Sequence, residues 1–321
     1  MTAGPGSLEL LTVGRISVDL YANEAGASFL DPQTFTKSVG GTATNVAIAS
    51  ARMGHRAAVF TKVGDDPFGQ YVRRKLETFG VDTRYVSTHP VMPTPLAFAA
   101  MDPPEDPQLL MYRYPMGPDQ TLQASEIDRQ VVVDVPILWL TGAWFSNAPA
   151  RQACWELLKI RDRRPHVVFD LDYRANFWSS REEATADISP VLDHVTVAVG
   201  NRTECEVAVG SGDPPQAARR LLERGVELAI VKMGGEGVMV ATAEGNTVVP
   251  PYFVEVVCGL GAGDAFGGML VHGLLSGWDP VRIVEYCNVA GAIVASRLLC
   301  SDAMPTLAEV EEALEARRVA G

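Results

Sequence analysis

Three glycines and an alanine precede Asp264, the residue whose type and position are best suited to chemistry. The segment 257–264 reads Val-Cys-Gly-Leu-Gly-Ala-Gly-Asp and leads into a long apolar run, residues 265–275. With so little side-chain bulk, the backbone N–H groups of this turn can approach an anion closely. The apolar run predicts a buried helix, whose N-terminus offers free donors and a partial positive charge. The pattern therefore predicts a phosphate-binding turn with a carboxylate beside it.

Asp264 itself can be interpreted in two ways. Aspartate is a preferred N-cap residue, and as a cap it would only satisfy the first N–H groups of the helix. A carboxylate beside an anion-binding turn can also act as a general base toward a hydroxyl that attacks phosphorus. The turn alone does not decide between these interpretations.

Composition limits the class of protein. The chain has 321 residues, of which 47% are hydrophobic and 21% charged, as is ordinary for a globular protein with a large core. The net charge of −12 argues against nucleic acid or an anionic membrane as a partner. Five scattered cysteines without a C-x-x-C pair predict neither disulfides nor a zinc site. No apolar run is long enough to span a bilayer, and residues 1–9 lack the features of a signal peptide, so we expect a cytoplasmic protein.

Strand and helix patterns alternate along most of the chain, without an internal repeat. We expect helices at residues 46–53, 66–79, 150–161, 214–224, 264–275 and 280–298, and one that begins at residue 306. Strands are expected within residues 8–21, 57–63, 131–140, 167–171, 195–199, 228–232, 238–242 and 247–257. This alternation predicts an α/β fold, with a mainly parallel central sheet and helices on both faces. Ligands bind at the carboxyl ends of strands in such sheets, where we expect residues 40–41, Asn201, Gly234 and the 259–264 turn.

Two stretches interrupt the alternation, at about residues 14–39 and 93–115. The second has two strand patterns, 93–101 and 109–114, joined by a turn rich in Pro and Asp. We therefore expect one domain, residues 1–321, that carries a small β lid made from these two stretches.

Two nucleotide-binding motifs do not fit the glycine turn. A dinucleotide fingerprint needs its glycines inside a βαβ unit, with an acidic residue about twenty positions on. The turn at 259–263 instead comes late and follows an expected antiparallel edge. The chain has no G-x-x-x-x-G-K-[ST] segment, so the P-loop is excluded. An NAD-dependent dehydrogenase stays open only as a distant alternative.

Four segments together resemble the ribokinase (PfkB) family of sugar kinases. They are Gly-Gly-Thr-Ala-Thr-Asn-Val-Ala at 40–47, Asn-Arg-Thr-Glu at 201–204, Lys-Met-Gly-Gly-Glu-Gly at 232–237 and Gly-Ala-Gly-Asp at 261–264. The resemblance covers residues 13–297 and implies a ribokinase-like fold that transfers the ATP γ-phosphoryl group to a sugar hydroxyl. Further segments resemble the branch of the family that phosphorylates the C6 hydroxyl of the sugar acid 5-dehydro-2-deoxygluconate in inositol catabolism: 14–21, 64–69, 93–95, 112–113 and 170–178.

The resemblance implies roles for particular residues. Asp264 matches the catalytic base, and the amides of Gly261, Ala262 and Gly263 match the anion hole. Asn201 and Glu204 match an N-x-x-E motif that acts on Mg²⁺ through water; the alternative is a helix cap with an acid three residues on. The implied ATP-binding residues are Asn201, Lys232, Gly234, Gly237, Gly261, Gly263 and Asn288. A surface lysine is the alternative for Lys232. Ala292 and residues 247–249 match the part of the family that packs against the base.

Substrate contacts follow the same logic. Asp19 can accept hydrogen bonds from hydroxyls, Asn45 can donate and accept, and Gly40 and Gly41 allow the backbone to approach the sugar. A sugar acid also needs a cation, because guanidinium pairs with carboxylate in a bidentate way. The candidates are Arg15, Arg113 on the lid and Arg174 past a core strand, with ordinary solvated arginines as the alternative.

Several points stay open. A 2-keto-3-deoxygluconate kinase, another fructokinase-like or ribokinase-like kinase, and a catalytically silent sugar-binding regulator would share most of these motifs. Cys258 and Gly259 stand where many relatives have Asp-Thr or Asn-Thr, a segment that helps bind a monovalent cation, so K⁺ dependence is undecided. Lids of this kind often pair between subunits, so we expect a homodimer through the lid, whose open strand edges would then be covered.

Overall fold

Thirteen strands and ten α-helices make up residues 7–320, the part of the chain that the structure, a computed structural model, describes. The strands are β1 (Leu10–Val13), β2 (Ser17–Ala22), β3 (Phe35–Gly40), β4 (Ala57–Gly64), β5 (Val86–His89), β6 (Leu96–Ala100), β7 (Gln108–Tyr112), β8 (Ile137–Thr141), β9 (Val167–Asp170), β10 (Val197–Asn201), β11 (Leu228–Lys232), β12 (Val238–Thr242) and β13 (Gly245–Val249). The helices are α1 (Thr42–Arg52), α2 (Pro67–Thr78), α3 (Arg129–Asp134), α4 (Ala148–Arg161), α5 (Arg181–Ile188), α6 (Arg202–Val209), α7 (Pro214–Glu223), α8 (Ala262–Leu275), α9 (Pro280–Ala295) and α10 (Leu307–Ala320).

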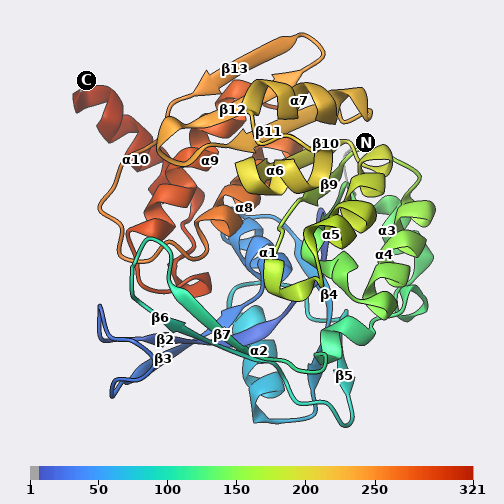
Figure 1. Ribbon diagram of the computed structural model, residues 1–321, viewed down its shortest axis with the longest axis vertical. Coiled ribbons are helices and arrows are strands. Elements are labelled where there is room, and N and C mark those ends of the chain that lie inside the picture. Colours follow the sequence, from blue (N-terminus) through green and yellow to red (C-terminus); the bar gives the residue numbers. More distant parts are fainter. Residues whose placement is uncertain (1–6, 321) are drawn as a thin grey trace.

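The large sheet confirms the predicted α/β class. Its strand order is β13-β12-β11-β10-β9-β8-β1-β4-β5, and all neighbours pair in parallel except at the antiparallel edge β11-β12-β13 (Figure 1). Strands such as β4 and β8 are buried along their whole length, as expected when helices cover both faces of a parallel sheet.

Alternate residues of the central strands point to two separate cores. Leu10 and Trp139 pack in the core under α1, α2, α8, α9 and α10, whereas Leu11 and Leu138 pack in the core under α3 to α7. This alternation follows from the two-residue period of a strand. The sheet is therefore a rigid layer between two sets of helices.

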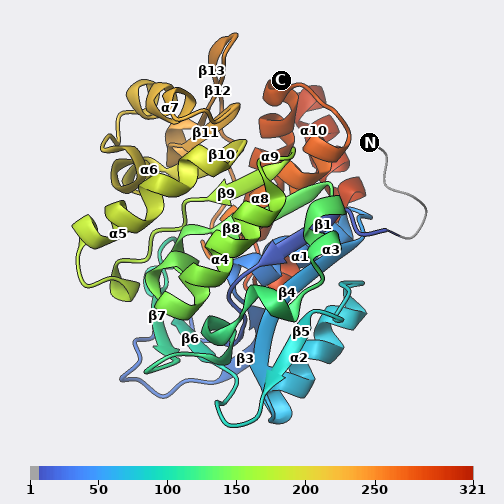
Figure 2. The same ribbon diagram turned by 90° about the vertical axis from the view of Figure 1, so that its right-hand side faces the viewer.

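The small sheet is built from the two stretches expected to form a lid, and we keep the name lid for it. Its order is β3-β2-β6-β7, with β2 parallel to β6 and the other pairs antiparallel. It lies toward the lower left of both views, level with the β4–β5 end of the large sheet (Figure 1 and Figure 2). β2 leaves the core three residues after β1, and β3 leads directly into α1. The lid is thus attached to the elements that carry the site.

Some expectations about elements were wrong. Only residues 247–249 of the strand predicted at 247–257 are in a strand, β13, because Pro250 and Pro251 have no N–H groups to extend the ladder. The 259–264 turn therefore follows a loop and not a strand, and Gly40 ends a lid strand and not a core strand. β5, α3, α5 and α6 were not predicted. The capping box that begins the last helix is confirmed, since Thr306 Oγ1 accepts the N–H of Glu309.

Within residues 7–320, no helix has both the length and the apolar character needed to cross a membrane. Residues 1–6, on which most of the signal-peptide prediction rests, lie outside the described part of the chain, as does residue 321.

Candidate active site

The glycine turn begins α8 with an open N-terminus. Gly261 is the N-cap residue and has a left-handed backbone, with φ of 83°. A Cβ atom there would lie 2.1 Å from Cys300 Sγ, so both the backbone and the space require glycine. No side chain caps this helix. The N–H groups of Ala262 and Gly263, at its first two positions, are therefore placed to bind an anion.

Asp264 is not the cap of this helix. It occupies the third helical position, and its Oδ2 accepts a hydrogen bond of 2.7 Å from Asn45 Nδ2. Cys300 Sγ lies 3.7 Å from the same oxygen. Burial raises the pKa of Asp264 to about 6, which Asn45 opposes and the charge of Asp172 reinforces. A carboxylate with this pKa is better matched to proton transfer near neutral pH than an ordinary aspartate.

A first pocket lies between the lid and Asp264, and encloses about 590 Å³ including its open mouth. Its lining is Arg15, Ser17, Asp19, Tyr21, Gly41, Thr42, Asn45, Pro95, Leu96, Ala97, Leu109, Met111, Arg113, Arg174, Leu260, Gly261, Asp264 and Cys300. The sequence-predicted substrate residues are thus brought together, with the exception of Gly40. We call this the sugar pocket.

Two polar side chains in the sugar pocket, Asp19 and Asn45, are fixed by hydrogen bonds to other residues. Asp19 accepts hydrogen bonds from Ser17 Oγ at 2.6 Å and Tyr21 Oη at 3.4 Å. Asn45 Nδ2 donates to Asp264, whereas Asn45 Oδ1 is buried without a protein partner. An unpaired buried carbonyl is costly unless a ligand supplies a donor.

The two glycines before α1, Gly40 and Gly41, are required by close contacts within the protein. A Cβ on Gly40 would lie 2.0 Å from Asp19 Oδ2, so the missing side chain makes room for that carboxylate and not for a sugar. Gly41 has φ of 102°, and its Cβ would lie 2.2 Å from the Arg15 carbonyl oxygen. Gly41 does line the pocket.

The three candidate arginines all line the sugar pocket. Arg113 Nη2 pairs with Asp119 at 3.0 Å, and Arg174 Nε pairs with Asp172 at 2.7 Å. Arg15 Nη2 donates to Thr42 Oγ1 at 3.0 Å, while its Nη1 is buried and has no partner. Two of the guanidinium groups are therefore neutralised by buried carboxylates, and the third keeps an unpaired donor for an anion.

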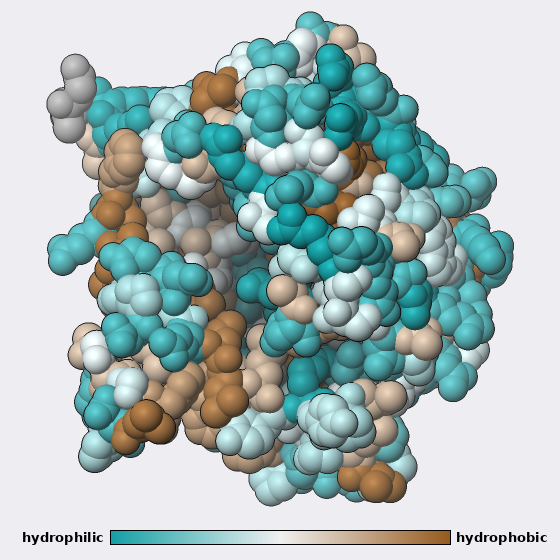
Figure 3. All heavy atoms as spheres, in the orientation of Figure 1, coloured by the Kyte–Doolittle hydropathy of each residue, from teal (hydrophilic) through white to brown (hydrophobic). Residues whose placement is uncertain are grey.

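A second pocket lies on the other side of the glycine turn. It is lined by Lys232, Gly234, Gly235, Gly237, Val238, Pro251, Tyr252, Phe253, Val254, Val256, Ala262, Gly263, Phe266, Cys287, Asn288, Gly291, Ala292 and Ala295. The space-filling view shows this face of the molecule hollowed beside the lid (Figure 3). Small residues of α9 form its floor, and residues 251–256 form its wall in place of the expected 247–249. The shape and apolar lining fit a nucleotide base, so we call it the nucleotide pocket.

Three of the residues predicted to bind ATP, Gly234, Gly237 and Asn288, line the nucleotide pocket. A Cβ on Gly237 would lie 2.3 Å from the Val249 carbonyl oxygen, whereas Gly234 faces open space. Asn288 Nδ2 donates to the Pro250 carbonyl oxygen at 2.9 Å, so it fixes the loop that forms the wall.

Lys232 is half-buried at the end of β11 and lines the nucleotide pocket. Its Nζ lies 3.5 Å from where a Cβ on Gly263 would be. Burial alone would lower the pKa of Lys232, but the carboxylates of Glu204, Asp170 and Asp264 outweigh this effect and raise it. A permanent positive charge therefore lies beside the anion-binding turn.

Asn201 and Glu204 line neither pocket and form the capping box of α6. Asn201 Oδ1 accepts the Glu204 N–H at 2.9 Å, and Glu204 Oε2 accepts the Asn201 N–H at 2.6 Å. Among residues 7–320, no three His, Cys, Asp or Glu side chains are grouped to hold a metal ion. Contact with an ion through water and phosphate oxygens fits this arrangement better than direct coordination does. Cys258 and Gly259 offer no side-chain oxygen to a monovalent cation.

Sequence reasoning missed four residues of this region. Asp170 and Asp172 lie within a segment used only for the resemblance, and Cys300 lies in a stretch without a pattern. Asp119 binds an arginine on the lid but has no local motif. What marks these residues is a contact with a side chain far away in the sequence. A motif of a few neighbouring residues cannot reveal such a contact.

Comparisons with known proteins agree with this geometry. The pfkB carbohydrate kinase family matches residues 7–307. The chain is 34% identical to a 5-dehydro-2-deoxygluconokinase of Geobacillus kaustophilus, over 97% of this chain and 95% of that protein. It is 29% identical to the Bacillus subtilis protein of the same name, over 97% of both chains. A protein described as a ribokinase II from E. coli, solved with ATP and Mg²⁺, has a TM-score of 0.87 at 24% identity, covering 96% of this chain and 99% of that one.

The fold, the glycine turn with its buried aspartate, and the match to the family over nearly the whole described chain lead to one assignment. This chain belongs to the pfkB family of carbohydrate kinases, phosphotransferases whose acceptor is an alcohol group.

Proposed function

We propose that the chain is a cytoplasmic kinase that uses ATP and Mg²⁺ to phosphorylate the terminal C6 hydroxyl of 5-dehydro-2-deoxy-D-gluconate in inositol catabolism. The observation that carries this proposal is the position of Asp264 beside a three-arginine sugar pocket and an open helix N-terminus. The names of the curated relatives support the same substrate. The five cysteines are free thiols, in keeping with a reducing compartment.

The chemistry follows from the positions of the side chains. ATP, when bound, supplies the γ-phosphoryl group. Asp264 would orient the C6 hydroxyl and accept its proton, which leaves late in a loose transition state. The N–H groups of Ala262 and Gly263, with the charge on Lys232, would hold the phosphoryl oxygens. Asn201 and Glu204 would act on Mg²⁺ through water.

The charge of the sugar pocket selects the kind of sugar. Arg113 and Arg174 form ion pairs with Asp119 and Asp172, whereas Arg15 forms no ion pair and keeps a buried donor for a substrate carboxylate. The unpaired Nη1 of Arg15 is the donor to the substrate carboxylate. A neutral hexose would leave this buried donor unsatisfied, which costs about 1–3 kcal/mol.

The test is a direct assay. With ATP, Mg²⁺ and 5-dehydro-2-deoxygluconate, the wild-type protein should form ADP and a sugar phosphate, and the phosphate position is read by ³¹P NMR. The Asp264→Asn variant keeps the shape but not the charge, and should lose about 10²–10⁴ in kcat with little change in binding. Faster turnover of 2-keto-3-deoxygluconate would favour that kinase instead. No turnover with any sugar, beside tight sugar binding, would favour the silent regulator.

We also propose a homodimer through the outer face of the lid. Ala97 and Met111 face the sugar pocket, so their neighbours Phe98, Leu110 and Tyr112 face outward. Phe98 stacks edge-to-face with Phe35 and Tyr112, at 5.4 and 5.6 Å between ring centres. Tyr112 is 60% exposed and Leu110 43%. A row of exposed apolar side chains on one sheet face is typical of an interface.

A further inference from the structure

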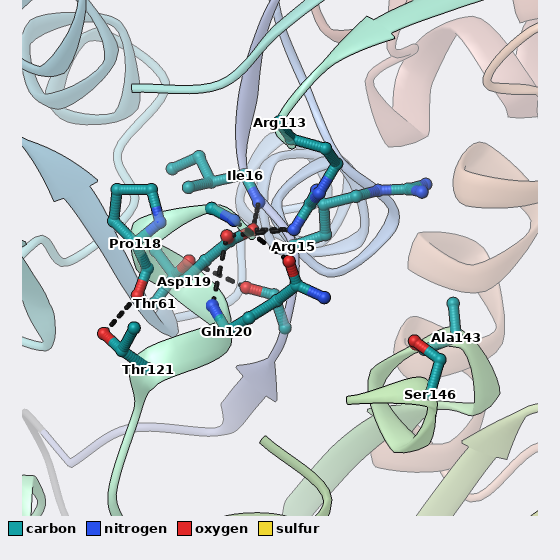
Figure 4. Close-up of polar contacts among 12 residues, drawn as sticks. Arg15, Ile16, Thr61, Arg113, Pro118, Asp119, Gln120, Thr121, Ala143 and Ser146 are labelled. Carbon is teal, nitrogen blue, oxygen red and sulfur yellow. Dashed lines mark hydrogen bonds and ion pairs between the residues drawn. The ribbon is translucent and has the colours of Figure 1, made fainter. Parts of the chain in front are cut away.

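Asp119 is a buried carboxylate that holds two parts of the sugar pocket without lining it. It lies on the 3₁₀ helix η1 (Pro118–Thr121), where the chain returns from the lid to the core, and its side chain is 0% exposed. Arg113 Nη2 donates to both of its oxygens, at 3.0 and 3.1 Å. Oδ2 also accepts the Ile16 N–H at 3.2 Å, and Oδ1 the Gln120 N–H at 3.2 Å (Figure 4).

These bonds join segments that are distant in sequence. Ile16 follows Arg15 directly, so Asp119 fixes the backbone beside one pocket arginine and the side chain of another. The guanidinium carbons of Arg15 and Arg113 lie 5.6 and 5.5 Å from the centre of the Phe177 ring. The two arginines are therefore gathered around one aromatic side chain, on the same wall of the pocket.

This arrangement is electrostatically unfavourable without a counter-charge. Burial lowers the pKa of Arg15, and the charges of Arg174 and Arg113 lower it further, against the effect of Asp172. Burial raises the pKa of Asp119, while Arg113 and the Ile16 N–H favour its charged form. The Asp119 carboxylate thus offsets the repulsion between the guanidinium groups of Arg113 and Arg15.

We propose that Asp119 is a positioning residue that gives the enzyme its preference for an acidic sugar. By holding Arg113 beside Arg15, it keeps two guanidinium groups directed at one substrate carboxylate, although it does not itself touch the substrate. This inference rests on the proposed sugar-acid kinase activity. It predicts that the charge of Asp119 matters for the anionic end of the substrate, and not for phosphoryl transfer.

The experiment compares an acidic and a neutral substrate. The Asp119→Asn variant keeps the side-chain volume and removes the charge. The substrates are 5-dehydro-2-deoxygluconate and its neutral counterpart, in which a hydroxymethyl group replaces the C1 carboxylate. We expect KM for the acid to rise about 10–100-fold, with kcat within about threefold and KM for ATP and for the neutral substrate unchanged. Asp82→Asn, which removes a charge paired with Arg84 outside the pocket, is the matched control and should behave as wild type.

Other outcomes would overturn the proposal. An unchanged ratio of acid to neutral kcat/KM in Asp119→Asn would show that the charge does not position Arg113. An equal loss toward acid, neutral sugar and ATP would show a purely structural role. A wild-type protein with no preference for the acid would overturn the proposed substrate, and with it the role of Asp119.

A second variant covers the case in which Asp119→Asn does not fold. A Cβ on Gly117 would lie 2.5 Å from Asp119 Oδ1 and 2.9 Å from Pro95 Cγ. Gly117→Ala therefore displaces the carboxylate without removing its charge. It should raise KM for the acid in the same selective way, and a Gly117→Ala protein with the wild-type ratio would contradict the proposal.

Discussion

At the scale of single residues, the site depends on buried charges that are each held by a partner. Asp264 is bound by Asn45, Arg113 by Asp119 and Arg174 by Asp172. The carboxylate beside the glycine turn could be predicted from sequence, because low side-chain bulk before an apolar helix is a local pattern. Asp119 could not, because Ile16, which donates to it, lies 103 residues away.

The raised pKa of Asp264 predicts the pH dependence of the reaction. The base must be deprotonated, and its pKa is about 6. We expect kcat/KM for the sugar to fall as pH drops through about 6, with a slope of one proton. Initial rates from pH 4.5 to 9 measure this. An acidic limb that stays near pH 4 would mean that Asp264 is solvated as an ordinary aspartate.

The same shift predicts an effect on stability. The pKa of Asp264 is about 6 in the folded protein, above its ordinary value of 3.8. The free energy of unfolding therefore falls as the pH rises from about 4 to about 6, and the loss is complete above pH 6. Asp264→Asn should therefore be more stable than wild type by about 1–3 kcal/mol at pH 8, and equal to it below pH 4. Urea unfolding at both pH values tests this. A variant that is less stable at pH 8 would show that the ionised carboxylate stabilises the fold.

At the scale of elements, the lid and the glycine turn are in direct contact. The Gly259 N–H donates to the Pro104 carbonyl oxygen at 2.8 Å, at the tip of the β6–β7 hairpin. The paired strands of that hairpin could be predicted from alternation and from the turn residues between them. Its docking on the turn could not, since it depends on the absence of a side chain at residue 259. The strand predicted at residues 250–257 was wrong. The prediction followed the apolar and β-branched residues of this segment, although the segment begins with two prolines.

Gly259→Ala tests this contact. The new Cβ would lie 2.2 Å from the Glu105 carbonyl oxygen, so the lid tip must move away. We expect KM for the sugar to rise about 3–30-fold, because the lid closes the sugar pocket, with a smaller change in KM for ATP. Glu105→Ala leaves the carbonyl in place and is the control. Wild-type kinetics for Gly259→Ala would mean that the lid position does not affect sugar binding.

At the scale of the whole molecule, one rigid sheet carries both pockets and the lid covers one of them. The central strands, most of the helices and the lid segments could be predicted, because they follow from periodicities of 2 and 3.6 residues, whereas β5, α3, α5 and α6 could not. The glycine turn lines both pockets, with Gly261 in one and Ala262 and Gly263 in the other, an arrangement that exists only in the folded chain.

The lid surface predicts the oligomeric state. Tyr112→Asp places a charge in the outward apolar row, and we expect it to convert a dimer to a monomer in sedimentation velocity runs. Val248→Asp, which adds a charge to an equally apolar exposed position on β13, should leave the dimer intact. A monomeric wild-type protein, or a dimer unaffected by Tyr112→Asp, would place the interface elsewhere or remove it.

The most direct measurement of the central claim is the ratio of kcat/KM for 5-dehydro-2-deoxygluconate to that for fructose and ribose, with ATP and Mg²⁺ at neutral pH. The arrangement of Arg15, Arg113 and Arg174 predicts a preference of about 5- to 150-fold for the acid, since the buried Nη1 of Arg15 then gains a partner, worth about 1–3 kcal/mol. Phosphorylation of a neutral sugar as efficient as that of the acid would contradict the account.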